Sequence, residues 1–240
     1  MALRASGLSG SNSSPASCQR RNWSKGRSLL SALLGYGGAV HGLRSALFEQ
    51  MQSAFFPVGL DQMASHVTFE ELQDTQFQIG AVSVRTIFAN HPGICLGYRL
   101  STPGGDIVYL PDHEAYERNE VERQEAAGES SHKGLDYARS QDEKVVEFMR
   151  NAEVVIADSQ YDEAEYSARR GWGHMCADDT VQLAIRAGAK RLFLFHHDPD
   201  HRDQKISEML ARAQSRVAAA GAPLLVDAAR EGVEVSLKIA

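Results

Sequence analysis

A cluster of histidines and aspartates follows a short apolar run in the last quarter of the chain. The run from Leu192 to Phe195 leads directly into His196-His197-Asp198-Pro199-Asp200-His201. Imidazole and carboxylate groups at this density are typical of metal sites and of proton transfer. A polar loop after a buried strand has the same appearance, so the cluster alone leaves both interpretations open.

Three further apolar runs also end in side chains that bind metals or move protons. Rigid strands that end at one rim of a sheet can hold neutral imidazoles and carboxylates in a pocket and leave one metal position open for water. Another histidine lies just before a predicted helix. Together with His196, the candidates are His91, Asp112, Asp158 and His174.

Strand-like and helix-like patterns alternate around these residues. Alternation predicts strands within residues 66–88, and Ser101-Thr-Pro-Gly-Gly105 predicts a hairpin between two further strands. Buried strands are expected at 153–157 and 191–195, separated by a helix that Asp178 or Asp179 caps and Gly188 terminates. The remaining expected elements are helices over 43–54 and 203–220 and strands over 224–227 and 233–239.

This order predicts an α/β protein, in an α+β layered arrangement with helices packed on sheet faces. Residues 114–143 carry many charges, and we expect a solvated loop with some helix there. Residues 1–27 are rich in Ser, Gly, Asn and Arg and have no periodic apolar pattern. Disorder is favoured over an organelle transit peptide for this start, because no amphipathic helix accompanies the arginines.

Composition narrows the class of protein. The 240 residues suffice for one large domain or two small ones, and the net charge of -6 argues against non-specific nucleic-acid binding, although a local basic groove stays open. Three widely spaced cysteines without a CxxC pair indicate a reducing compartment and no thiolate zinc site. Because no apolar run approaches about 18 residues, we expect no membrane span.

Five motifs, in this order along the chain, resemble the metallo-β-lactamase superfamily, in the branch near ribonuclease Z and the cyclic-nucleotide and phosphonate phosphodiesterases. The resemblance runs from about residue 35 to the end of the chain. The motifs are Asn90-His-Pro-Gly-Ile-Cys-Leu-Gly-Tyr-Arg-Leu100, Val108-Tyr-Leu-Pro-Asp112, Asp158-Ser-Gln-Tyr161, Gly171-Trp-Gly-His174 and Leu194-Phe-His-His-Asp-Pro-Asp-His201.

The resemblance implies a role for each candidate. His91 matches a ligand of the first metal, Asp112 the aspartate that bridges two metals, and His196 a ligand of the second metal. His174 matches the histidine that assists at the scissile phosphate, and Asp158 lies where a supporting or catalytic carboxylate is found. The implied cofactor is a pair of zinc ions, with manganese as an alternative. His197, Asp198 and His201 are expected to support His196 locally.

The chain departs from the family in one respect. The string H-x-H-x-D-H, which supplies two histidines to the first metal and an aspartate and a histidine to the second, is absent. We therefore expect residues 28–240 to form an incomplete, N-terminally truncated metallo-β-lactamase-like αββα sandwich, with residues 1–27 disordered or unrelated to it. The matched residues give each metal two protein ligands, whereas catalytic zinc normally has three.

Three hypotheses about the function are consistent with these observations. The first is a metal-dependent hydrolase, of phosphodiesterase type, that acts through metal-activated water on a small-molecule or nucleotide phosphodiester, with nucleic acid left open. Loss of the N-terminal motif would impair it unless the missing ligands come from elsewhere, such as a partner chain. The second is an inactive remnant or a binding or subunit protein of the same fold, and the third is a structural α/β module. We further expect a cytoplasmic location, no membrane partner, and a homodimer as one possible assembly.

Overall fold

The computed structural model describes residues 2–5, 28–31, 43–52, 59, 62, 67–70 and 75–237. The chain divides into two compact units, residues 8–75 and a larger unit of residues 1–7 with 76–240. The smaller unit contains β2 (Ser28–Ser31), α1 (Leu43–Gln50) and β3 (Val67–Glu70), and β2 pairs in parallel with β3. The expected helix near residue 43 is thus present. Outside residues 2–5, the start of the chain for which we expect disorder lies beyond the described residues.

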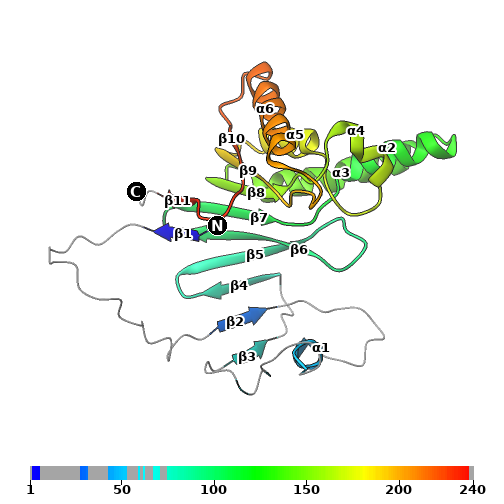
Figure 1. The fold of residues 1–240 in the computed structure, drawn as a ribbon. Helices are drawn as coiled ribbons and strands as arrows, with labels where there is room; N and C mark the ends of the chain where they lie inside the picture. The colour runs from blue at the N-terminus through cyan, green and yellow to red at the C-terminus, as the bar shows by residue number, and fades with distance from the viewer. Residues whose placement is uncertain are drawn as a thin grey trace. The chain divides into compact units, whose positions relative to one another are not determined.

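The larger unit is built on a mixed seven-stranded sheet (Figure 1) with the order β10-β9-β8-β7-β6-β5-β4. Strands β7 to β10 run parallel, and β4 to β7 form an antiparallel meander. The strands are β4 (Gln76–Ile79), β5 (Val82–Phe88), β6 (Leu96–Thr102), β7 (Gly105–Leu110), β8 (Val154–Asp158), β9 (Arg191–Phe195) and β10 (Leu225–Ala228). A separate parallel pair joins β1 (Ala2–Ala5) to β11 (Glu234–Leu237). The sequence prediction of an α/β, layered fold is confirmed.

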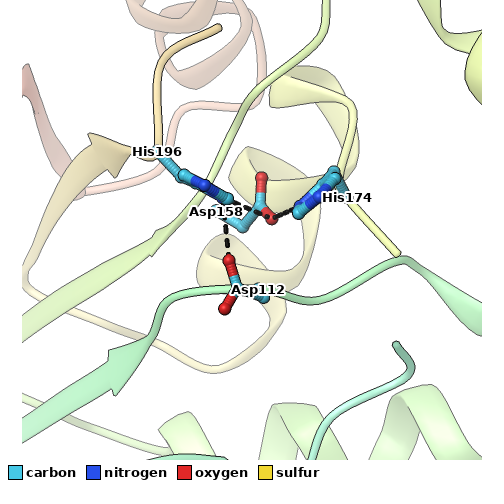
Figure 2. A group of neighbouring side chains, drawn as sticks. All are labelled: Asp112, Asp158, His174 and His196. Atoms are coloured by element: carbon cyan, nitrogen blue, oxygen red, sulfur yellow. Dashed lines mark hydrogen bonds and ion pairs between the residues drawn. The ribbon is translucent and has the colours of Figure 1, made fainter. Parts of the chain in front are cut away.

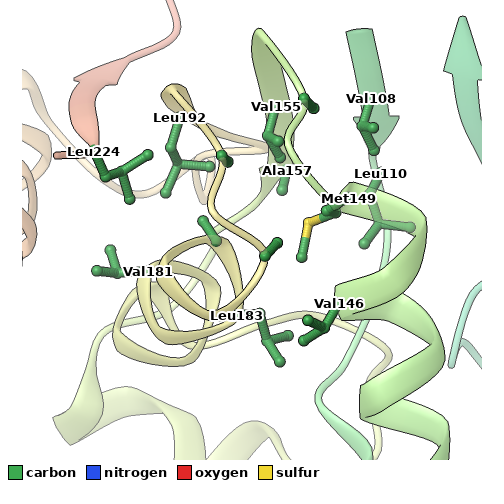
Figure 3. Close-up of a cluster of buried hydrophobic side chains, with 14 of the residues drawn as sticks. Val108, Leu110, Val146, Met149, Val155, Ala157, Val181, Leu183, Leu192 and Leu224 are labelled. Atoms are coloured by element: carbon green, nitrogen blue, oxygen red, sulfur yellow. The ribbon is translucent and has the colours of Figure 1, made fainter. Parts of the chain in front are cut away.

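Alternate residues of the central strands face two different apolar layers, as a period of two requires. Val155 and Ala157 of β8 and Leu192 of β9 belong to the main core, where Figure 3 shows them against helical side chains such as Met149. The helices of the larger unit are α2 (Tyr116–Ala127), α3 (His132–Met149), α4 (Glu163–Tyr166), α5 (Ala177–Arg186) and α6 (Asp203–Ala219); α3, α5 and α6 contribute to this core.

The opposite face of the sheet carries a smaller cluster. Val154 and Ile156 of β8 and Phe193 of β9 pack there with Val235 of β11. This alternation places successive side chains on a helix-covered face and on a face that β11 covers. The carboxyl ends of the strands are consequently held between two packed layers.

The expectation for residues 114–143 was wrong, because this stretch lies mainly in the long helices α2 and α3. The Ser131 hydroxyl caps α3, and Gly128, with φ 63°, terminates α2 in the left-handed conformation. The buried Asp142 of α3 accepts hydrogen bonds from the first backbone amides of α2, those of Tyr116 and Glu117, at 2.9 Å each. Both helices carry many charges, and polar residues and a glycine set the ends described here. Their sequence therefore resembles that of a solvated loop.

The helix near residue 178 forms as predicted but begins differently. Cys176 precedes its first turn without a side-chain cap, and Asp178 and Asp179 lie inside that turn. The prediction that either aspartate caps the helix was therefore wrong, although both carboxylates still favour the positive end of the helix dipole. Among the described residues, no helix has both the length and the apolar character needed to cross a membrane.

Candidate metal centre

The candidate residues gather at one edge of the large sheet. Asp158 is the last residue of β8, His196 directly follows β9, and Asp112 lies two residues beyond β7. Since β7, β8 and β9 are parallel, their carboxyl ends meet at the same edge. Strand β5 points the same way as β7 through the antiparallel β6, which brings the loop of His91 to this edge as well.

Four side chains form a compact group of possible metal ligands (Figure 2). One ligand atom from each of Asp112, Asp158, His174 and His196 lies within 4.8 Å of those of the other three. His196 Nδ1 is 3.0 Å from Asp112 Oδ1 and 3.5 Å from Asp158 Oδ2. His174 Nδ1 is 2.8 Å from the same Asp158 oxygen. Two imidazoles therefore converge on one carboxylate, and the second carboxylate faces one of them.

Asp158 is fully buried and accepts more hydrogen bonds than it has oxygens. Its Oδ2 accepts from the backbone amide of His113, and its Oδ1 accepts from those of Gln160 and Met175. These hydrogen bonds offset the free-energy cost of burying the carboxylate away from water. The contact with His174 Nδ1 fixes the ring, and a proton on Nδ1 leaves the other ring nitrogen, Nε2, free as an acceptor.

His196 has an unusual backbone conformation. Its φ of 60° lies in the left-handed region, which a residue other than glycine rarely adopts. Strain of this kind is held in place by the surrounding structure and is common at functional sites. The pKa of His196 is raised, first by the hydrogen bond to Asp158 and further by the charges of Asp158 and Asp112, against the opposing effect of burial.

His91 lies beside this group but outside it. Its ring centroid is 5.6 Å from that of His174, which is in turn 4.7 Å from that of His196. His91 Nδ1 is 3.2 Å from the carbonyl oxygen of Gly93 and 3.1 Å from its amide nitrogen. With the proton on Nε2, Nδ1 accepts from the Gly93 amide, whereas a proton on Nδ1 would be donated to the carbonyl and leave the lone pair on Nε2. The three imidazoles thus form a row along the edge of the sheet.

The other polar residues after β9 contact neighbouring segments and not His196. His201 Nε2 is 3.0 Å from Glu165 Oε1, and His197 Nε2 is 3.3 Å from the carbonyl of Ala229. Asp198 pairs with Arg169 at 3.3 Å. Their hydrogen bonds tie the loop after β9 to neighbouring segments, and their support of His196 stays a prediction.

Sequence reasoning assigned no role to three residues around the group. The thiol of Cys95 is 3.4 Å from Asp112 Oδ2, and its pKa is raised to about 11 by burial and then by the nearby carboxylate. His113 is fully buried, and burial lowers its pKa to about 4. The buried Glu114 binds the loop that carries His174. Asp112-His113-Glu114 directly follows a predicted strand, and this run of three polar residues was the available signal.

The donor set fits a divalent metal ion. Imidazole nitrogens and carboxylate oxygens are the ligands of zinc and manganese in proteins, and the four ligand atoms are close enough to share one ion. The side chains of Asp112 and His196 are 31% and 36% exposed, so the group is open to solvent on their side. Asp158, fully enclosed, is placed to orient the imidazoles.

Sequence comparison finds relatives that share one name. A ribonuclease Z of Thermoplasma acidophilum is 24% identical over 198 residues, which is 72% of this chain and 61% of that protein. A ribonuclease Z of Geobacillus kaustophilus is 32% identical over 73 residues, which is 30% of this chain and 24% of that protein. The chain therefore spans less than two thirds of the length of these relatives. No family model matches it.

Structure comparison shows the fold. The metallo-β-lactamase fold protein YhfI from Bacillus subtilis superposes with a TM-score of 0.50 at 18% identity, covering 70% of this chain and 55% of that one. A diphosphatase from the PhnP family has a TM-score of 0.50 at 12% identity, covering 90% of this chain and 60% of that one. The ribonuclease Z matches and the shared fold agree with the motifs: the chain has the metallo-β-lactamase fold, and its sequence is similar to that of ribonuclease Z.

Proposed function

We propose that this chain is a metal-dependent hydrolase of phosphodiesters. The observation that carries the proposal is the convergence of Asp112, Asp158, His174 and His196 at the carboxyl edge of the sheet. The relatives support the reaction class, since a ribonuclease cleaves phosphodiesters and a diphosphatase cleaves bonds between phosphates. In this proposal Asp112 and His196 would hold the metal, which is zinc, and His91, which lies beside the group, would be a further ligand as the resemblance implies.

The chain's own residues divide the remaining work. A bound divalent ion would supply positive charge for the phosphate and would lower the pKa of a water molecule. His174, held by Asp158 through Nδ1, presents Nε2 to the scissile phosphate and acts there as a general acid or base. Asp158 keeps the tautomer and orientation of His174 and stabilises its protonated form. These roles need the two side chains to stay paired throughout the reaction.

The substrate and setting complete the proposal. A small-molecule or nucleotide phosphodiester fits the open group at the sheet edge, and the net charge of -6 disfavours a long nucleic acid held by charge alone. We place the protein in the cytoplasm because its cysteines are few and form no CxxC pair. A homodimer stays a prediction, which light scattering on purified protein will check.

Metal analysis and hydrolysis of bis-p-nitrophenyl phosphate test the proposal together. We expect the purified chain to bind about one or two zinc ions and to release nitrophenol. Asp112→Ala should lose metal and activity together, because this carboxylate faces His196 at 3.0 Å. Asp136→Ala, in α3 away from the group, is the matched control and should keep both. A chain without bound metal and without hydrolysis would be the inactive member of the fold instead.

A further inference from the structure

Glu114 is a buried carboxylate that belongs neither to the group of possible ligands nor to the main apolar core. Its side chain is 2% exposed, and its backbone lies two residues beyond Asp112. An ionised group in such a position needs several hydrogen bonds to offset the loss of water. The partners that supply these bonds indicate what the residue does.

The carboxylate of Glu114 holds the loop that leads to His174. Its Oε1 accepts from the backbone amide of Gly171 at 2.8 Å and from the hydroxyl of Tyr166 at 2.7 Å, and its Oε2 accepts from the amide of Gly173 at 3.2 Å. Both glycines have positive φ, 79° and 91°, so the loop adopts a course that other residues rarely take. One carboxylate therefore holds two glycines of left-handed conformation just before His174.

The backbone of Glu114 holds the loop of His91 at the same time. Its amide donates to the carbonyl of Asn90 at 3.0 Å, and its carbonyl accepts from the Asn90 side chain at 3.1 Å. A side chain at Gly173 would collide with the ring of His91 and with Pro92, so the two loops are packed directly together. Glu114 is thus bonded to both loops at the point where they touch.

We propose that Glu114 is a positioning residue that sets the relative placement of His91 and His174 across the candidate metal centre. The expected effect on catalysis rests on the proposed function, whereas the placement of the two loops does not depend on it. Replacing the carboxylate by an amide turns an acceptor into a donor and leaves at least one of the three partners unsatisfied. The loop before His174 should then loosen, while the strand-end residues Asp112, Asp158 and His196 keep their places.

Trp172 provides a reporter for the loop. The chain has two tryptophans, Trp23 and Trp172, so Trp23→Phe leaves a single emitter between the two glycines that Glu114 holds. In this background, Glu114→Gln should raise the acrylamide quenching constant of Trp172. With bis-p-nitrophenyl phosphate it should lower kcat about 10- to 100-fold and change KM less than about twofold, since a displaced His174 impairs the chemical step more than binding.

Two control variants separate positioning from general loss of stability. Glu117→Gln removes an exposed carboxylate of α2 that pairs with Arg139, and it should change neither readout. Tyr166→Phe removes one buried partner but leaves both glycine amides on the carboxylate, so it should lower the melting temperature and keep kcat near the starting value. Equal quenching in the starting protein and in Glu114→Gln, or an unchanged kcat with a loosened loop, would overturn the inference.

A failed proposed function gives a different result from a failed inference. If the Trp23→Phe protein hydrolyses nothing, the hydrolase proposal is wrong, and quenching of Trp172 still decides whether Glu114 holds the loop. If Glu114→Gln does not fold, amide hydrogen exchange in the unmodified protein decides. The amides of Gly171 and Gly173 must then be protected far beyond that of the exposed Gly232, and equal rates would overturn the inference.

Discussion

At the scale of single residues, the pair of Asp158 and His174 distinguishes this centre from a plain cluster of ligands. A buried carboxylate that accepts from backbone amides on both oxygens cannot turn, so it holds the histidine in one orientation. An imidazole held through Nδ1 has its other nitrogen available for proton transfer. This geometry favours a catalytic role for His174 over a role as a structural metal ligand.

His174→Gln tests that assignment. We expect kcat for a phosphodiester to fall about 10²- to 10⁴-fold, the usual contribution of a positioned acid or base, with bound metal unchanged. Steady-state kinetics and elemental analysis of the same preparation measure both quantities. His132→Gln, at an exposed position in α3, should behave like the unmodified protein. Loss of metal together with activity would show that His174 is a ligand.

The sequence could reveal the members of this group because they end strands. Three of the four lie at the ends of β7, β8 and β9, and parallel strands bring their ends to one edge whatever the loops do. Glu114 could not be assigned in the same way. Its partners, Gly171 and Gly173, lie 57 and 59 residues further along the chain, and only the folded loops bring them to it.

At the scale of elements, the helices α2 and α3 show where sequence periodicity loses its signal. In α2 only Gln124 is buried, so no apolar stripe marks the helix. Its ends are fixed instead by Asp142 of α3 and by hydrogen bonds between Gln124 and Ser131. Helix α6, with a regular apolar face, was predicted within one residue of its observed end. Apolar packing is visible in a sequence, whereas distant polar caps are not.

A buried aspartate in the first turn of α5 predicts how the stability of the fold depends on pH. Burial raises the pKa of Asp179 to about 6, from an ordinary value of 3.8, while the nearby Arg118 lowers it only in part. The ionised form is therefore disfavoured in the folded chain, and its cost to the unfolding free energy grows as the pH rises from about 4 to about 6. Asp179→Asn should remove this cost and stabilise the protein at pH 7 by on the order of 1–3 kcal/mol.

Urea unfolding at pH 4 and pH 7 measures the effect. The gain for Asp179→Asn should be near zero at pH 4 and complete at pH 7. Asp178→Asn is the control with the opposite sign, because Asp178 forms ion pairs with Arg212 and Arg216 and its loss should destabilise the fold. A gain for Asp179→Asn that is equal at the two pH values would contradict the assigned pKa.

At the scale of the larger unit, the sheet depends on cover for both of its faces. Helices α3, α5 and α6 bury one face, and on the other Val235 of β11 packs with Ile107, Val154, Ile156 and Phe193. The strands whose ends carry Asp112, Asp158 and His196 run between these layers. Their mutual distances therefore depend on packing far from the site, which ties the chemistry of the edge to the stability of the whole unit.

Val235→Asp tests the cover that β11 provides. Val235 is 6% exposed, and an unpaired carboxylate in that position should cost about 3 kcal/mol or more, because its desolvation is not offset by any partner. The next residue, Ser236, faces solvent, so Ser236→Asp introduces the same charge one position along the strand at little cost. Thermal unfolding and binding of an apolar dye should separate the two variants, with a lower melting temperature and more bound dye for Val235→Asp alone. Equal behaviour would mean that β11 does not seal this face. With the face opened, the strand ends should lose their alignment, so Val235→Asp should also weaken zinc binding although it touches none of the ligands.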